Sequence, residues 1–351
     1  ERLAKWQESE SLTAQADYWR KLRTAASLPI DNPAGSNRIV DSQHYTISFT
    51  AETTRRLLNE APGAYRTRVN DLLLTALMLT LRDWTGESHH LIDLESHGRA
   101  DLFGGINLSR TVGWFTALYT LSLQLPTETD SGTVLKDIKE QLRKVPYDGV
   151  GYGVLRYLCG DSLPQGQILF NYLGQFAQSA GSGEFRFVTE DTGRSHSMHG
   201  EREHLIVING QTVNGCLSLI WTYSGEQYEA QTIEGLADNY QQQLEKLIEH
   251  CSGSYGYTPS DFPLSLLKQV QLDQLAQSYG ENISDIYPLS PMQEGMLFHS
   301  MYAPESGIYF EQIHFCLNGQ LNTDAFLKAW QHLIDRHTIL RTAFLHETDR
   351  P

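Results

Sequence analysis

The sequence predicts an α/β (α+β) sandwich, in which helices cover a sheet of short strands. First, strand-like and helix-like segments alternate along the chain. Second, residues 69–84 are apolar around most of a helical circumference, which is typical of a buried helix. Third, residues 215–223 alternate between apolar and polar side chains, as in a half-buried strand. These patterns together favour helices packed on a sheet.

The individual elements follow from the same two periodicities. Helices are predicted at 3–25, 51–60, 69–84, 131–144, 229–250, 264–279, 292–302 and 322–336. Strands are predicted at 43–50, 90–95, 117–125, 167–173, 203–209, 216–223 and 308–317. Thr50 can cap the helix that follows it. Residues 149–153 predict a tight glycine-rich loop, and because no Lys-Ser/Thr pair follows them they do not predict a phosphate-binding loop.

The length of 351 residues is enough for two or three domains. Residues 252–263 are rich in Gly, Ser and Pro, which is typical of a linker. We therefore expect one domain at 1–250, an interdomain linker at 251–284 and the start of another domain at 285–351. The chain begins with Glu1 and runs to Pro351 without a domain end, so we expect an internal slice of a larger multidomain enzyme.

Composition excludes several kinds of partner. The formal net charge is −15, which disfavours binding to nucleic acid. The longest uncharged stretch contains Gly, Pro, Thr and Ser, and it predicts a buried strand better than a membrane helix. Four scattered cysteines without a CxxC pair predict reduced thiols. We expect a cytoplasmic protein that binds neither nucleic acid nor membrane.

Four motifs follow one another in the first part of the chain. They are Glu-Ser-His-Gly-Arg at 95–99, Ser-Arg-Thr-Val-Gly-Trp-Phe-Thr at 109–116, Pro-Tyr-Asp-Gly-Val-Gly-Tyr-Gly at 146–153, and Phe-Asn-Tyr-Leu-Gly-Gln at 170–175. In this order and spacing, residues 1 to about 250 resemble the C-terminal part of an epimerization domain of a nonribosomal peptide synthetase. Each motif alone is weak, but the ordered set is specific.

The last part of the chain carries two further motifs. Residues 287–299 read Tyr-Pro-Leu-Ser-Pro-Met-Gln-Glu-Gly-Met-Leu-Phe-His, and residues 336–344 read Arg-His-Thr-Ile-Leu-Arg-Thr-Ala-Phe. They resemble the first two motifs of a condensation domain from the same synthetases. The resemblance implies lobes similar to chloramphenicol acetyltransferase. It also implies epimerization of a carrier-bound aminoacyl or peptidyl thioester, followed by condensation with a D-configured donor.

The resemblance also implies roles for individual residues. Glu95 would be the acid/base that moves the α-proton, and Asn171 and Tyr172 would contact the thioester or the enolate. From the residues alone, a surface carboxylate paired with Arg99 is the favoured interpretation of Glu95, and the resemblance reverses this preference. Asn171 could likewise be a strand-end turn residue and Tyr172 a half-buried aromatic residue. Arg110 could hold the phosphate of 4'-phosphopantetheine on a partner carrier domain, or pair with an internal carboxylate.

The histidines give weaker signals. His97 could assist catalysis, but a hydrogen-bonded core histidine is the simpler interpretation. His89 and His90 do not match the two-histidine motif of this superfamily, because the aspartate that follows them stands one place early. His196, His199 and His204 are spaced loosely enough to suggest a metal site, but no cysteine or acidic ligand completes it, so we expect no metal.

Two functions remain open. In the first, the chain is part of an epimerase and condensation enzyme whose partners are a peptidyl carrier domain and the neighbouring synthetase domains. The isolated chain is then expected to be inactive, because the two-histidine motif is absent from it. In the second, the chain is a non-catalytic platform for docking of carrier proteins.

Overall fold

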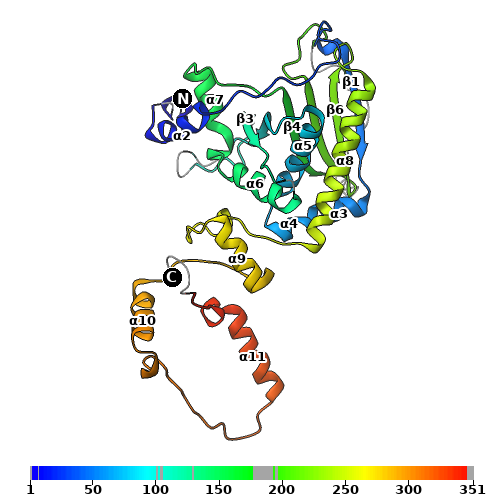
Figure 1. Ribbon diagram of the computed structural model, residues 1–351. Helices are drawn as coiled ribbons and strands as arrows, with labels where there is room; N and C mark the ends of the chain where they lie inside the picture. Colours follow the sequence, from blue (N-terminus) through cyan, green and yellow to red (C-terminus); the bar gives the residue numbers. More distant parts are fainter. Residues whose placement is uncertain are drawn as a thin grey trace. The chain divides into compact units, whose positions relative to one another are not determined.

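A computed structural model describes residues 2–6, 8–99, 102, 106–128, 130–176, 193 and 197–345 of the protein (Figure 1). The chain divides into two units. The first unit comprises residues 1–261 and 268–282, and the second comprises 262–267 and 283–351. Residues 268–282, which lie in the predicted linker, therefore belong to the first unit. The domain boundaries that the sequence suggests stay a prediction.

A six-stranded mixed sheet forms the centre of the first unit, with the strand order β1-β6-β5-β4-β2-β3. β2 runs parallel to β4, and β4 runs parallel to β5, while the other neighbours are antiparallel. The strands are β1 (Ser42–Ser48), β2 (His89–Ser96), β3 (Ala117–Gln124), β4 (Ile168–Phe176), β5 (Ile206–Val213) and β6 (Cys216–Ser224). The predicted α/β fold class is confirmed by this sheet and its helices.

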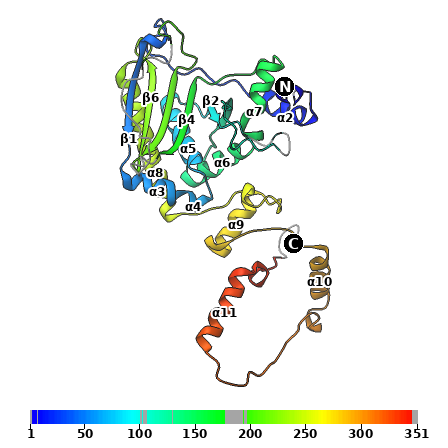
Figure 2. The same ribbon diagram turned by 180° about the vertical axis from the view of Figure 1, so that it is seen from behind.

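Helices cover one face of this sheet (Figures 1 and 2). α5 (Val69–Thr85) is buried along eleven of its residues, as the apolar pattern of 69–84 predicts. It packs between α6 (Ser131–Arg143) and α8 (Ala230–Gly253). Two shorter helices, α3 (Ala51–Asn59) and α4 (Ala61–Tyr65), precede it. Thr50 caps α3 as predicted, because its hydroxyl accepts a hydrogen bond from the backbone N–H of Thr53.

Three predicted elements of the first unit differ in the structure, and one of them, the helix predicted at 264–279, begins only at Gln269. The helix predicted at 3–25 is divided into α1 (Arg2–Trp6) and α2 (Glu10–Arg20), because Ser9 caps a new helix at its N-terminus. The loop predicted at 149–153 is helical. A 3-10 turn at Pro146–Gly149 leads into α7 (Val150–Gly153) and a π-helical turn at Val154–Leu158. Gly151 allows the close approach of α2, since a Cβ there would lie 2.3 Å from Gln15 Oε1.

The second unit contains α10 (Pro291–Tyr302) and α11 (Thr323–Arg336), both close to their predicted bounds. The strand predicted at 308–317 is wrong, because this segment forms no strand in the structure. Its apolar side chains, such as Phe310, Ile313 and Phe315, are exposed. A strand needs a neighbouring strand for its backbone groups, and the described part of this unit provides none.

Short 3-10 turns occur in both units. They lie at Ile39–Asp41, Pro259–Asp261 and Gly280–Asn282 in the first unit, and at Pro304–Ser306 and Thr338–Arg341 in the second.

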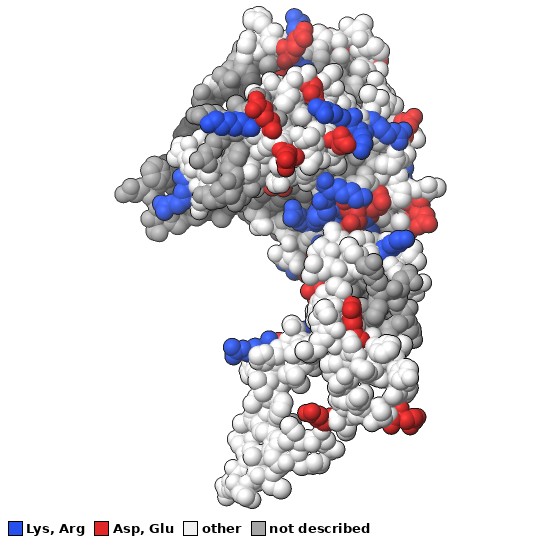
Figure 3. Space-filling model, turned by 90° about the vertical axis from the view of Figure 1, so that its left-hand side faces the viewer, with Lys and Arg blue, Asp and Glu red and all other residues white. Residues whose placement is uncertain are grey.

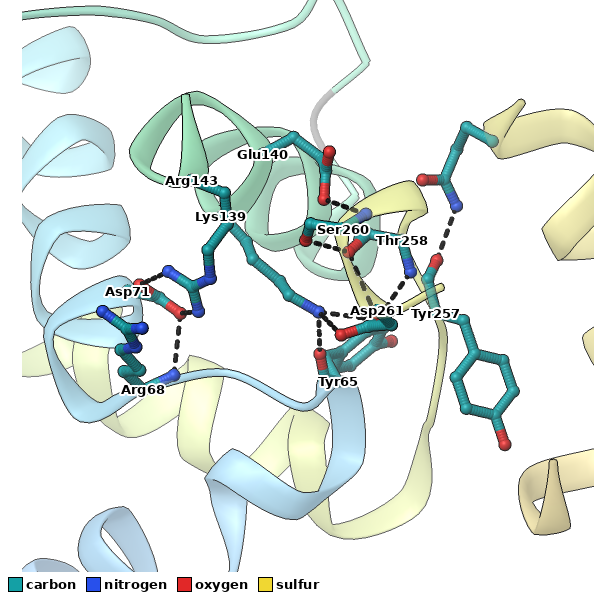
Figure 4. A network of polar contacts seen from close by, with 11 residues as sticks. Tyr65, Arg68, Asp71, Lys139, Glu140, Arg143, Tyr257, Thr258, Ser260 and Asp261 are labelled. Atoms are coloured by element: carbon teal, nitrogen blue, oxygen red, sulfur yellow. Dashed lines mark hydrogen bonds and ion pairs between the residues drawn. The ribbon is translucent and has the colours of Figure 1, made fainter. Parts of the chain in front are cut away.

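The chain after α8 packs back onto the first unit. We call residues 254–261 and 268–282, which include α9 (Gln269–Tyr279), the connector. Lys139 of α6 is fully buried, and its Nζ lies 2.6 and 2.7 Å from the two carboxylate oxygens of Asp261 in the connector (Figure 4). Lys139 Nζ also donates to the carbonyl of Tyr65 at 2.8 Å. Leu272 and Ala276 of α9 are buried as well. The connector is therefore a packed part of the first unit.

Candidate functional site

The structure brings two of the predicted site residues into contact. Asn171 Nδ2 donates a hydrogen bond to Glu95 Oε2 at 3.2 Å, although the two residues are 76 positions apart in the sequence. Glu95 stands next to last in β2, and Asn171 lies in β4. Since these neighbouring strands are parallel and Leu94 pairs with Phe170, the following residues, Glu95 and Asn171, face each other. The parallel register therefore explains the contact.

Glu95 is exposed, and Asn171 is half-buried. Asn171 donates to one carboxylate oxygen, and among the described residues the other oxygen, Oε1, accepts no hydrogen bond. Because successive side chains of a strand point to opposite faces, Leu91, Asp93 and Glu95 lie on one face of β2. Ile92 and Leu94 lie on the other face. Ile92 and Leu94 belong to the hydrophobic core. Glu95 thus projects away from the core, which suits a group that exchanges protons.

The alternative pairing of Glu95 with Arg99 is not found. Arg99 instead organises the loop between β2 and β3, where its guanidinium donates to the carbonyls of Leu108, Thr111 and Gly113. The guanidinium also lies 4.4 Å from the centre of the Phe115 ring. Gly98 is required here, because a Cβ at its φ of +60° would lie 1.6 Å from the carbonyl oxygen of Phe115.

The loop is exposed at each residue from Ser109 to Trp114. Arg110 is exposed, and among the described residues it makes no ion pair, so a pairing with an internal carboxylate is not found there. Val112 and Trp114 are 100% and 87% exposed. The backbone carbonyls of Leu108, Thr111 and Gly113 bond to Arg99, and the exposed side chains of the described part of the loop include the basic Arg110 and the apolar Val112 and Trp114.

Tyr172 lies on the other face of β4. Successive residues of a strand point to opposite faces, so Asn171 and Tyr172 cannot both face Glu95 from a regular strand. Tyr172 packs against the core, and its hydroxyl lies 3.0 Å from Thr212 Oγ1 in β5. A catalytic contact from its hydroxyl stays a prediction.

The histidines differ in their exposure and in their hydrogen-bond partners. His97 is exposed and accepts a hydrogen bond from the backbone N–H of Arg99, so its interpretation as a core histidine is wrong. His90 is buried against the carbonyl of Glu87, and this burial lowers the pKa of its imidazole. His199 is exposed, and His196 lies outside the described residues. No group of three or more potential metal ligands occurs among the residues that the structure describes.

His204 has a partner that the sequence did not suggest. Its Nε2 lies 2.8 Å from Asp93 Oδ2, and both side chains are buried. Asp93 Oδ1 accepts from Thr120 Oγ1 at 2.6 Å and from the backbone N–H of Gly166 at 2.8 Å. The available sequence signal was an acidic residue in an otherwise apolar strand, which needs a buried partner.

A profile of the condensation domain matches residues 1–259 and 283–351 of the chain. The chain belongs to the condensation domain family. A linear gramicidin synthase protein of Brevibacillus parabrevis is 39% identical over 98% of this chain, and bacitracin synthase 3 of Bacillus licheniformis is 37% identical over 99%. The chain spans only 5% and 6% of the lengths of these relatives.

Solved structures show the same fold. The epimerization domain from the third module of tyrocidine synthetase B is 36% identical, with a TM-score of 0.66 over 72% of this chain and 58% of that chain. The condensation domain of the monacolin K polyketide synthase has a TM-score of 0.56 at 17% identity, over 71% of this chain and 60% of that chain. The predicted fold of chloramphenicol-acetyltransferase-like lobes is thereby confirmed.

The surface and the helices add two observations. On the face drawn in Figure 3, basic and acidic side chains lie next to one another, so the charge of −15 is not gathered into one acidic patch there. Among the described residues, no helix has both the length and the apolar character needed to cross a membrane.

Proposed function

We propose that the first unit carries half of an epimerization site, in which Glu95 is the acid/base for the α-proton of a carrier-bound aminoacyl or peptidyl thioester. The observation that carries this proposal is the exposed Glu95 carboxylate, held by Asn171 at 3.2 Å at the end of β2. The likeness to the tyrocidine synthetase epimerization domain supports it, because that similarity extends over 72% of this chain.

The chemistry fits the geometry. A carboxylate that removes the α-proton needs an oxygen within hydrogen-bond reach of the Cα–H and must be free of a permanent cation partner. Glu95 Oε1 meets the second condition among the described residues, because Arg99 is engaged by the loop carbonyls. Asn171 would fix the orientation of the carboxylate through Oε2, so that Oε1 faces the substrate.

Inversion at the α-carbon also needs a proton delivered to the opposite face. Glu95 can serve only one face, and we propose that a histidine from the two-histidine motif of a preceding lobe serves the other. The isolated chain would then bind substrate poorly and would not exchange the α-proton.

The substrate would arrive on the 4'-phosphopantetheine arm of a peptidyl carrier domain. Arg110 suits the phosphate of this arm, because it is exposed and a guanidinium can donate two parallel hydrogen bonds to phosphate. The second unit would begin a condensation domain that accepts the D-configured product as donor. Its motifs at 287–299 and 336–344 support this assignment, since both lie within the matched residues 283–351.

The deciding experiment follows the α-proton. A synthetase segment that includes the preceding lobe, loaded with an aminoacyl thioester on its carrier domain, is placed in D₂O, and deuterium incorporation at the α-carbon is measured by mass spectrometry. We expect incorporation with the native protein and incorporation slower by about 10²- to 10⁴-fold with Glu95→Gln. Undiminished incorporation with Glu95→Gln would exclude Glu95 as the acid/base.

The exposed loop favours a second candidate, a platform for carrier-protein docking. Arg110, Val112 and Trp114 would then contact a carrier domain whether or not chemistry follows. Exchange of the α-proton distinguishes the epimerization site from the docking platform. If the segment with the preceding lobe binds the carrier domain but never exchanges the α-proton, the platform role is the better description.

A further inference from the structure

Asp93 and His204 form a buried pair that the proposed chemistry does not use. Asp93 is 2% exposed and His204 is 5% exposed, and their side chains approach to 2.8 Å. Burial of such a pair carries a desolvation cost, which only a complete set of partners can offset. Asp93 stands two residues before Glu95 in β2, so both carboxylates project from the same face of the sheet.

The Asp93 carboxylate connects β2 to three neighbouring elements. Thr120 of β3 and the backbone N–H of Gly166, just before β4, contact Oδ1 at 2.6 and 2.8 Å. His204, just before β5, contacts Oδ2. A single side chain therefore links β2 to β3 and to the beginnings of β4 and β5.

The hydrogen bonds of Asp93 lie near the junction of β2 and β4, where few residues of the two strands pair. β2 and β3 pair over eight positions, but β2 and β4 pair over only three, from Ile92–Ile168 to Leu94–Phe170. Glu95 and Asn171 follow directly after the last of these pairs. Gly166 closes the junction tightly, because a Cβ there would lie 2.7 Å from Asp93 Oδ1 and 2.8 Å from the Asp93 nitrogen.

We propose that Asp93 and His204 are positioning residues, which hold β2 against β4 so that Glu95 keeps its distance and orientation to Asn171. This inference rests on the proposed function, because it assumes that Glu95 performs the proton transfer. A displacement of a reacting group by about 1 Å can cost on the order of 10²-fold in rate. Loss of the Asp93–His204 pair is therefore expected to act on kcat rather than on substrate binding.

The experiment uses four variants in the whole synthetase and measures kcat and KM for α-proton exchange, together with the melting temperature. Asp93→Asn and His204→Phe break the pair, His204→Gln keeps an N–H donor, and Gly166→Ala inserts a methyl group into the junction. Asp71→Asn is the matched control. Asp71 is equally buried at 1%, pairs with Arg143 at 2.6 Å, and lies on α5 rather than on the sheet.

We expect Asp93→Asn, His204→Phe and Gly166→Ala to lower kcat by about 10- to 100-fold with little change in KM. His204→Gln should have a kcat close to the native value, because it keeps an N–H donor. Asp71→Asn should keep the native kcat even if its melting temperature falls as much as that of Asp93→Asn. The inference is overturned if Asp93→Asn and His204→Phe keep kcat within about twofold while Glu95→Gln slows exchange by about 10²- to 10⁴-fold. Retained exchange in Glu95→Gln would instead remove the proposed function, and the positioning role with it.

Discussion

Lys139 of α6, which pairs with Asp261 of the connector, and Glu95 at the end of β2 are both charged residues of the first unit. Their surroundings are opposite. Lys139 is 0% exposed and has three oxygen partners, two from Asp261 and one from Tyr65. Burial lowers the pKa of Lys139, while the hydrogen bond with Asp261 opposes this effect. Glu95 is exposed and receives one side-chain hydrogen bond, from Asn171.

The difference indicates what each charge is for. A buried ion pair with all partners present contributes little to stability over an apolar substitute, but it makes the loss of either partner costly. An exposed carboxylate with an open oxygen contributes almost nothing to stability and is available for proton transfer. Lys139 should therefore affect folding and not chemistry, and Glu95 should do the reverse.

Glu95→Gln should give the largest effect. General acid–base catalysis contributes about 10²- to 10⁴-fold in rate, so exchange should fall by that factor. Because the side chain is exposed, the free energy of unfolding should change by less than about 0.5 kcal/mol. Deuterium incorporation measures the exchange rate, and urea denaturation of the same preparations measures the free energy of unfolding. A large loss of stability in Glu95→Gln would show that the carboxylate is structural.

Lys139→Met should destabilise the first unit by about 3–5 kcal/mol, because Asp261 is left as an unpaired buried charge. Urea denaturation followed by tryptophan emission measures this, since Trp6, Trp19, Trp84, Trp114 and Trp221 all lie in the first unit.

Lys136→Met is the matched control for Lys139→Met. Lys136 lies on the same helix and pairs with Asp273 of the connector at 2.7 Å, but its partner is 39% exposed. Its loss should cost only about 0–1 kcal/mol. The double variant Lys139→Met/Asp261→Leu should recover much of the stability. Equal effects of Lys136→Met and Lys139→Met would contradict the contrast between buried and exposed pairs.

Asn171→Ala should reduce exchange less than Glu95→Gln does. It removes the side-chain donor that orients Glu95, and a hydrogen bond to a charged group is worth about 1.5–3 kcal/mol, or roughly 10- to 100-fold in rate if all of it is used in the transition state. The ratio of kcat to KM for exchange measures this loss. Asn209 of β5, which pairs with Asn171, offers the control Asn209→Ala. An Asn209→Ala loss as large as that of Asn171→Ala would point to a general effect on the sheet.

Asp130, the N-cap of α6, gives a smaller and pH-dependent effect. Its carboxylate accepts from the N–H groups of Gly132 and Thr133, and the hydrogen bond with Thr133 holds the pKa of Asp130 below its ordinary value. This stabilisation is present above the ordinary pKa and is lost as the pH falls through the lowered value. Asp130→Ala should cost about 1 kcal/mol at neutral pH and less in acid, where the protonated carboxyl still accepts a hydrogen bond but has lost its charge, and Asp130→Asn should keep most of the cap at both pH values. A pH-independent cost would rule out the charged cap.

Local periodicity predicted most elements of the first unit, whereas Glu95 and Asn171 were placed in one site only by the resemblance of the ordered motifs to an epimerization domain. Neither signal predicted the pairs Asp93–His204 and Lys139–Asp261, whose partners are 111 and 122 positions apart. A local signal for Lys139 existed, since it stands four residues after Leu135 on the apolar side of α6, where a solvated lysine is out of place. Its partner depends on how the connector folds back, which no local pattern contains.

Tyr172→Phe should have the smallest effect on exchange and tests the strand geometry itself. Because the hydroxyl contacts Thr212 on the face opposite to Glu95, its removal should cost about 0.5–1.5 kcal/mol of stability and change kcat by less than about threefold. Thr212→Val, which removes the same contact from β5, should cost a similar amount and leave exchange unchanged. If Tyr172→Phe alone lowers kcat by tenfold or more, the hydroxyl must leave Thr212 and reach the substrate. The catalytic role that the motif at 170–175 implies for Tyr172 would then hold, and β4 would have to turn at Tyr172 when substrate binds.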